Sequence, residues 1–253
     1  DPELRLAALL VPPAAVPVDY VDQEGTRQVF WPIFDPDITA AIKQVLDDKE
    51  IVITDGHHRY ETALAYRAER RAEDGDPTQP QPYDYVLMFL TSVQDPGLCI
   101  LPTHRVIKTV DRQLPANLLS RLAERFEVLP AEGAASLEQQ LMAFAGRANA
   151  FGLYLGGSAR HICVWRKPED ASSGILESLD VSVLLREILE PLFNIDADAL
   201  KAGDRVEYTI SEAQACASVE RGEAQAAFIL NPTLLSQVWD TARALQTMPQ
   251  KST

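Results

Sequence analysis

The sequence predicts an α/β or α+β protein in which a mixed sheet is flanked by helices. Short apolar runs of strand length alternate along the chain with amphipathic stretches whose apolar residues recur at helical spacing. Of the 253 residues, 46% are hydrophobic and 24% are charged, an ordinary globular composition that excludes a disordered chain, a collagen-like repeat and a coiled coil. No period repeats along the chain, which excludes solenoids and propellers.

The pattern changes near residue 112, which predicts one part over 1–112 and a second α/β part over 113–253. The predicted elements of the first part are a helix over 37–46, a strand over 51–53, a helix from 57 or 58 to 72, a proline-rich loop over 75–82, and strands over 85–93 and 98–101. Those of the second part are helices over 114–125 and 136–147, a hairpin of 150–155 with 161–165, a helix over 181–189, a strand over 205–210, a helix over 212–221, a strand over 226–230 and a helix over 233–245.

The net charge of the chain disfavours some classes of function. The formal net charge is −14, from 23 basic and 37 acidic side chains. Duplex DNA is therefore an unfavourable partner, because its phosphates repel an acidic surface. The longest apolar runs, such as Val86–Leu90, are too short to span a bilayer, which predicts no membrane association.

The three cysteines show no metal or redox spacing. They lie more than fifty residues apart, at Cys99, Cys163 and Cys216. This spacing excludes a zinc knuckle and a redox dithiol, and it is typical of the reducing cytoplasm.

The richest chemistry lies in the run Thr54-Asp55-Gly56-His57-His58-Arg59-Tyr60-Glu61-Thr62-Ala63. An apolar run precedes it, a glycine turn lies within it and a helix follows, so the first N–H groups of the helix point outward without partners. Two imidazoles and a guanidinium at this positive end predict an anion site. His57–Arg71 carries four arginines and two glutamates, a basic island in an acidic chain. The alternative is structural: Asp55 caps the helix, one histidine packs inside, and Arg59 pairs with a carboxylate.

Individual residues of this turn suggest separate roles. Adjacent helical residues point about 100° apart, so His57 and His58 do not both face one ligand from a regular helix, and one of them is expected to be structural. Asp55 is placed to bind a metal ion or to orient an imidazole.

A second group of donors, Thr103-His104-Arg105, follows the strand predicted over 98–101. The alternative interpretation is a satisfied surface His–Arg pair. If the strands over 51–53 and 98–101 run parallel in one sheet, their ends meet, and His104 lies within about 10 Å of His58 or Arg59. The closing Lys251-Ser252-Thr253 has the last residues of a phosphate-binding loop but not its glycines.

The motifs resemble a widespread prokaryotic family, domain of unknown function 1015. The similarity covers the turn at 53–63 and continues through 85–88, 95–98, 101–106, 179–181, 206–209, 222–223, 226–228, 230–233 and 248–253. Family members are longer at both ends, so the resemblance implies that this chain is truncated. Leu185 departs from the family, where a histidine is expected.

The Asp-Gly-His-His-Arg turn is also similar to the phosphate-binding turn of the ParB and sulfiredoxin superfamily, which includes partition proteins, a sulfinic-acid reductase and a free-serine kinase. This resemblance implies a ParB/sulfiredoxin-like nucleotide-binding core within 1–112, and ATP or ADP with Mg²⁺ as cofactors. Fold alone does not fix the reaction, because function depends on the site.

The leading hypothesis is phosphoryl transfer from a nucleotide to a small hydroxyl substrate such as serine, or to water. His58, Arg59 and the Gly56 turn hold the phosphates. His57 stabilises the transferring group or acts as general acid, and Asp55 binds Mg²⁺ or acts as base. Further expected phosphate contacts are Thr103, His104, Arg105 and Lys251. The alternatives for the base are a carboxylate in the additional N-terminal segment of the longer family members, or one of Asp19, Asp22 and Glu24. A homo-oligomer is compatible with the sequence.

Two other functions compete. One is a nucleotide-binding switch without catalysis, related to partition proteins. The other is a sulfiredoxin-like repair enzyme, which requires an exposed cysteine near the turn. The position of Cys99 in a predicted apolar strand disfavours repair chemistry, because a buried cysteine is inert.

Overall fold

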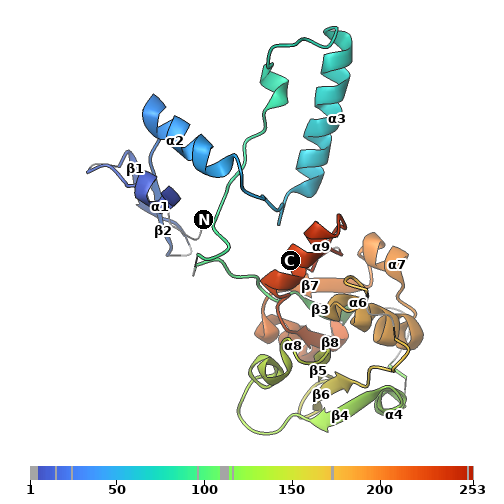
Figure 1. Cartoon of the computed structure of the whole chain (residues 1–253). Helices are drawn as coiled ribbons and strands as arrows, with labels where there is room; N and C mark the ends of the chain where they lie inside the picture. The colour runs from blue at the N-terminus through green and yellow to red at the C-terminus, as the bar shows by residue number, and fades with distance from the viewer. Residues whose placement is uncertain are drawn as a thin grey trace. The chain divides into compact units, whose positions relative to one another are not determined.

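The computed structural model describes residues 5–14, 16–23, 25–95, 97–108, 114–115, 117–171, 174–249 and 251–252. The chain forms two compact units (Figure 1). One consists of Asp1–Val52 with Tyr85–Leu98, and the other of Ile53–Asp84 with Cys99–Thr253. The boundary between two parts near residue 112 stays a prediction.

The first unit contains a short helix, a hairpin and a longer helix. Its elements are α1 (Arg5–Leu9), β1 (Val18–Val21), β2 (Arg27–Phe30) and α2 (Pro36–Leu46). The sequence predicted α2 only. Asp35 starts this helix, since its carboxylate accepts from the N–H groups of Asp37 and Ile38. The β1–β2 turn is held by Asp22, which accepts from the N–H of Thr26 at 2.8 Å.

The strands predicted over 51–53, 85–93 and 98–101 do not form among the described residues. Their apolar side chains lie largely in solvent, Leu87 at 99% exposure and Phe89 at 92%. An apolar run shows only that a segment suits a sheet, whereas a strand also needs a hydrogen-bonded neighbour. These segments have no such neighbour in the described chain, so the prediction of strands is wrong here.

The helix α3 (His57–Glu73) confirms the helix predicted after the glycine turn. The proline-rich loop folds back on it through a short helical turn, η1 (Pro82–Asp84). Asp84 accepts from Arg71 Nη2 at 2.8 Å and from Arg67 Nε at 2.7 Å. These ion pairs hold the pKa of the Asp84 carboxyl well below its ordinary value.

A six-stranded sheet, in the order β4-β6-β5-β8-β3-β7, is the centre of the second unit. Its strands are β3 (His104–Lys108), β4 (Phe126–Pro130), β5 (Ala150–Tyr154), β6 (Arg160–Trp165), β7 (Val206–Thr209) and β8 (Ala224–Leu230). Every pair is antiparallel, which corrects the prediction of a mixed sheet. The predicted hairpin is confirmed as β5 and β6, joined through Gly156 and Gly157 at positive φ.

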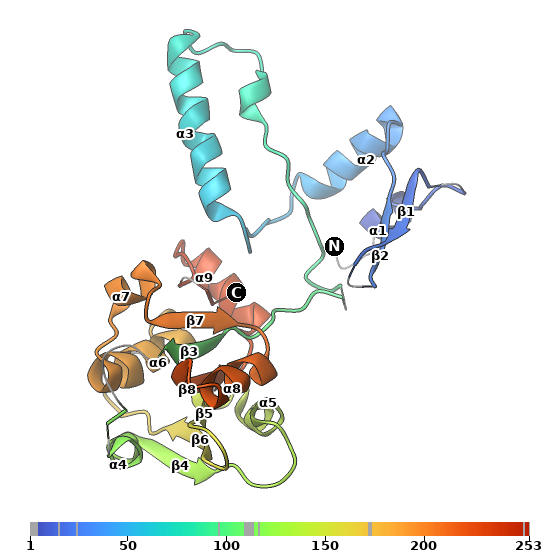
Figure 2. The same ribbon diagram turned by 180° about the vertical axis from the view of Figure 1, so that it is seen from behind.

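Helices cover both faces of this sheet (Figure 2). On one face, α4 (Leu118–Ala123), α6 (Asp180–Leu184) and the π-helix η3 (Leu185–Phe193) enclose a core that includes Phe126, Phe151 and Phe228. On the other, α5 (Leu137–Leu141) and α8 (Glu212–Glu220) pack over Val106 and Ile229. The remaining elements are η2 (Met142–Phe144), α7 (Ala197–Ala202) and α9 (Leu235–Arg243).

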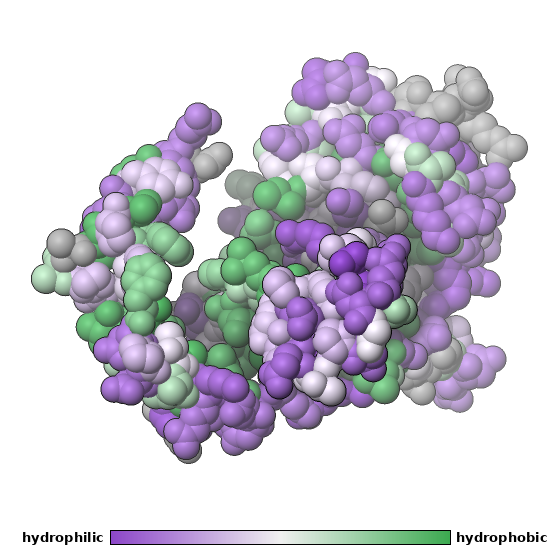
Figure 3. Space-filling view, turned by 90° about the horizontal axis from the view of Figure 1, so that it is seen from above, coloured by the Kyte–Doolittle hydropathy of each residue, from purple (hydrophilic) through white to green (hydrophobic). Residues whose placement is uncertain are grey.

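Hydrophilic residues dominate the surface visible in Figure 3, in keeping with the net charge of −14. In the described part of the chain, no helix has the length and apolarity needed to cross a bilayer.

Gly152 of β5 lies between Ile229 of β8 and Leu137 of α5. A Cβ at this position would lie 3.0 Å from Ile229 Cβ and 3.1 Å from Leu137 Cβ. We therefore expect Gly152→Ala to lower the free energy of unfolding by about 1–3 kcal/mol, because the helix must shift. Urea unfolding measures this change in stability. An unchanged midpoint would show that the packing between α5 and the sheet accommodates an additional methyl group.

Candidate functional site

The predicted anion turn is an open helix start. Gly56 precedes α3 at φ 79° and ψ 20°, and no side chain caps the helix. The helical ladder begins with the N–H of Tyr60, which donates to Gly56 O at 3.0 Å. The N–H groups of the three residues between them, at 57–59, thus have no carbonyl partner within the helix. This arrangement leaves donors at the positive end of a 17-residue helix.

Arg59 folds back over Gly56 to reach Asp55. Its Nη2 donates to Asp55 Oδ2 at 3.0 Å, and both side chains are exposed, at 79% and 92%. A Cβ on Gly56 would lie 2.8 Å from the same Nη2, so the site needs glycine both for this contact and for the positive φ. The guanidinium is held at the mouth of the turn by a carboxylate that water also reaches, so an anion can exchange with it.

The two histidines lie together at this helix start. The ring centroids of His57 and His58 are 4.3 Å apart and the rings are tilted by 52°. His58 Nδ1 lies 3.3 Å from Glu61 Oε2, and its backbone carbonyl accepts from Thr62 Oγ1. The His58 residue is exposed and His57 is half-buried.

The basic island predicted over 57–71 is largely neutralised. Arg67 and Arg71 pair with Asp84, and Arg70 pairs with Glu73 and Asp74. Of the four arginines, Arg59 lies at the helix start, where its exposed guanidinium pairs with the exposed carboxylate of Asp55.

The described residues contain no group of three potential metal-ligating side chains. Mg²⁺ in nucleotide sites is commonly held by one or two carboxylates together with the phosphates of the substrate. Asp55 as a ligand of Mg²⁺ therefore stays a prediction.

The alternative carboxylates have structural partners. Asp19 forms an ion pair with Arg27 at 2.6 Å, which lowers the pKa of its carboxyl, and Asp22 holds the β1–β2 turn. Glu24 lies outside the described residues.

His104 is buried between strand and helix. Its Nδ1 accepts from the N–H of Leu230 at 3.2 Å, so the ring proton is on Nε2, which donates to Glu138 Oε1 at 2.7 Å. The side chain is fully buried, and desolvation lowers the pKa of the imidazole. This position corrects the interpretation of His104 as half of a surface pair at a strand exit: it opens β3, and it ties β3 to β8 and α5. Glu138 was missed because 34 residues separate the partners.

The His104 network predicts a pH dependence. The lowered pKa means that the folded chain favours the neutral ring, so its contribution is complete above the unfolded pKa of about 6.5 and is lost as the pH falls below it. His104→Ala should lower stability at neutral pH by about 1–3 kcal/mol, since the Leu230 N–H loses its acceptor. In urea unfolding, this substitution should also flatten the fall in the free energy of unfolding that the parent shows as the pH is lowered below about 6.5. A slope identical to that of the parent would contradict the assigned neutral ring.

Arg105 and Lys251 lie together, although 146 residues separate them. Arg105 Nη2 donates to Lys251 O at 2.8 Å, and Nη1 donates to Thr103 O. The guanidinium also lies 5.1 Å from the Tyr208 ring centroid. Arg105 is only 5% exposed, and burial lowers its pKa to about 10. Two backbone carbonyls and an aromatic ring thus surround a buried cation.

The expected meeting of His104 with the Asp55–Arg59 turn stays a prediction. Its premise of two parallel strands is wrong, because neither residues 51–53 nor residues 98–101 form a strand.

The cysteines correct one further expectation. All three are free thiols, and Cys99 is exposed rather than buried in a strand. Burial raises the pKa of the Cys163 thiol to about 12 and that of Cys216 to about 11, so these two are poor nucleophiles at neutral pH.

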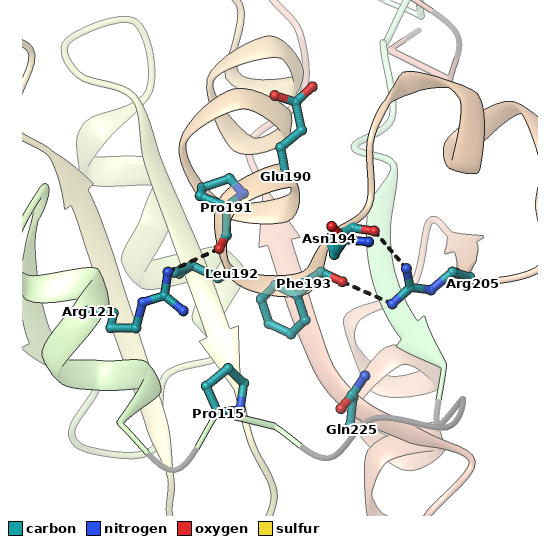
Figure 4. Close-up of a pocket in the computed structure, with 9 residues that line it drawn as sticks. All are labelled: Pro115, Arg121, Glu190, Pro191, Leu192, Phe193, Asn194, Arg205 and Gln225. Atoms are coloured by element: carbon teal, nitrogen blue, oxygen red, sulfur yellow. Dashed lines mark hydrogen bonds between the residues drawn. The ribbon is translucent and has the colours of Figure 1, made fainter.

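A separate cavity of about 300 Å³ lies beside the end of η3 (Figure 4). Arg205 donates to the carbonyls of Phe193 and Asn194, and Arg121 donates to that of Pro191. These contacts cap a helix C-terminus, where cations are favourable. The two arginines therefore have a structural role.

Fold and site together define an α/β protein with a six-stranded antiparallel sheet and an open, glycine-capped helix start suited to an anion. Residues 5–182 match the model of the family described as protein of unknown function DUF1015, so the chain belongs to that family. No curated protein matches the sequence.

Several solved structures show distant similarity. Free serine kinase in complex with AMP matches at 16% identity and a TM-score of 0.34, over 60% of this chain and 52% of that one. A mutant of free serine kinase in complex with ADP matches at 16% and 0.39, over 85% and 77%. A conserved hypothetical protein from Pyrococcus furiosus matches at 19% and 0.38, over 79% and 67%. The chain thus spans about half the length of the first of these, and at these TM-scores the similarities carry no argument about its activity.

Proposed function

We propose that this protein binds a nucleotide by its phosphates at the Asp55–Arg59 turn and transfers a phosphoryl group to a small hydroxyl compound such as serine, or to water. One observation carries the proposal: the start of α3 is uncapped by any side chain, and Arg59 and two imidazoles surround it. Backbone N–H groups at a helix start bind phosphate oxygens, and a guanidinium adds charged hydrogen bonds.

The groups at the turn have different roles in the proposed reaction. The N–H groups of residues 57–59 and the Arg59 guanidinium bind the phosphates, and His58 contributes from the exposed side. His57, whose ring contacts that of His58, stabilises the charge on the transferring group. Phosphoryl transfer depends mainly on such positioning and charge stabilisation.

Asp55 acts as the base after an exchange of partners. Without ligand its carboxylate holds Arg59. A phosphate that takes the guanidinium releases this carboxylate beside the reacting group. The bond from the terminal phosphorus to the bridging oxygen of the nucleotide breaks, a bond to the acceptor oxygen forms, and the acceptor proton passes to Asp55.

Incubation of the full chain with ATP or ADP, with and without serine, tests this reaction. We expect phosphoserine, or inorganic phosphate when water is the acceptor. Asp55→Asn should bind nucleotide but lose turnover, while Asp76→Asn, which removes a carboxylate paired with Arg71 elsewhere in the same unit, should retain it. Nucleotide binding without any product from the parent protein would support the non-catalytic switch instead, and no binding would overturn both functions.

A further inference from the structure

The Arg105 guanidinium is a buried cation without an acidic partner in the described chain. Its polar contacts there are the carbonyl oxygens of Thr103 and Lys251. A guanidinium that is buried loses much of its hydration energy. Neutral carbonyl oxygens compensate for this loss less well than a carboxylate or a phosphate does. The site therefore has the chemistry of an oxyanion receptor, with neutral oxygens in the place of the anion.

One of these oxygens comes from a short C-terminal strap, which we define as Pro249, Lys251 and Ser252 in the described chain. The strap is anchored by Ser252, which is 5% exposed. Ser252 Oγ donates to Pro249 O at 2.6 Å, and Ser252 O accepts from Thr233 Oγ1 at 2.5 Å. These few hydrogen bonds bring the Lys251 carbonyl onto the guanidinium.

The strap closes at a conformational cost. Lys251 has φ 58°, in the left-handed region that a side chain with a Cβ disfavours. Its own side chain is exposed, so no burial of the lysine offsets this strain. A segment whose backbone is strained at Lys251 is suited to displacement by a stronger partner of Arg105.

We infer that Arg105 is an oxyanion-binding residue that the C-terminal strap plugs, and that a carboxylate or phosphate group binds by displacing the Lys251 carbonyl. The bidentate fork of arginine matches either group. The inference does not depend on the proposed nucleotide site at residues 55–59, and either could be wrong without the other.

The test compares two substitutions at one residue. Lys251→Ala removes the ammonium group and keeps the strained φ, whereas Lys251→Gly removes both. Glycine should hold the strap more tightly, so oxyanion affinity in Lys251→Gly should be about fivefold lower than in Lys251→Ala. Leu245→Gly is the matched control, because Leu245 also has a positive φ, of 53°, but lies outside the strap; it should leave the affinity unchanged.

Inorganic phosphate and acetate are titrated separately into the full chain by calorimetry, and hydrogen exchange of a peptide over 246–253 is followed by mass spectrometry. Saturable binding of phosphate or of acetate identifies which anion the site binds. Binding of that anion should be accompanied by faster hydrogen exchange in the 246–253 peptide. Equal affinities in the glycine and alanine variants, or binding without a change in exchange, would overturn the displacement of the strap. Absence of binding by both anions would overturn the site itself.

Discussion

Asp180→Asn should raise the free energy of unfolding by up to about 3 kcal/mol at neutral pH. Asp180 opens α6 in a half-buried position, and desolvation raises the pKa of its carboxyl to about 6. Asn149 Nδ2 donates to Asp180 Oδ1 at 2.7 Å. Asparagine keeps an acceptor of the same shape for this bond and removes the buried charge.

The sign of this effect depends on pH. A carboxyl whose folded pKa lies above its unfolded value of about 3.9 favours the folded state when protonated, so the parent protein loses stability as the pH rises from about 4 to about 6. The increase in the free energy of unfolding caused by Asp180→Asn should be small near pH 4 and complete above about pH 6. Urea unfolding across this range measures it. Asp198→Asn removes an exposed carboxylate on α7 and is the control for net charge. A gain that is independent of pH would show that desolvation of Asp180 is not its cause.

Arg59→Ala should weaken nucleotide binding about tenfold to hundredfold and leave the fold intact. Charged hydrogen bonds to phosphate contribute about 1.5–3 kcal/mol, and an exposed ion pair such as Arg59–Asp55 contributes little to stability. Calorimetry with ADP and ATP measures the affinity, and thermal unfolding checks the fold.

Arg70→Ala is the matched control for this experiment. It removes another arginine of α3 that is paired with carboxylates, at the far end of the same helix. Its nucleotide affinity should equal that of the parent. If Arg59→Ala unfolds early, the structural interpretation of Arg59 is correct; if both variants weaken binding equally, the effect comes from general charge.

Local signals in the sequence predicted most of the helices and four of the six strands in the central sheet. The spacing of apolar residues located α2, α3 and α8, and the glycine pair located the β5–β6 hairpin. The strand β3 was missed because it begins with His104 and Arg105, whose polarity is typical of a loop. Their burial depends on distant partners, Glu138 and the strap, which no local pattern reveals.

Strands that were predicted but do not form have a related cause. The run at 85–93 has the composition of a buried strand, yet the described structure gives it no neighbouring strand. The composition of a segment shows that it is compatible with a strand, but the strand forms only where a neighbouring strand is available for hydrogen bonding. The same holds for the site: the sequence located the Asp55–Arg59 turn, while the ion pair across Gly56 became visible only in three dimensions.

The most direct test of the phosphate-binding turn is a titration of the isotope-labelled full chain with ADP, followed by the backbone amide signals of His57, His58 and Arg59. If their N–H groups bind the phosphates, these three signals should shift together and saturate, while the amide signals at the C-terminal end of α3, around Glu73, should stay in place. Saturable binding of ADP that leaves the signals of residues 57–59 unmoved would contradict the site.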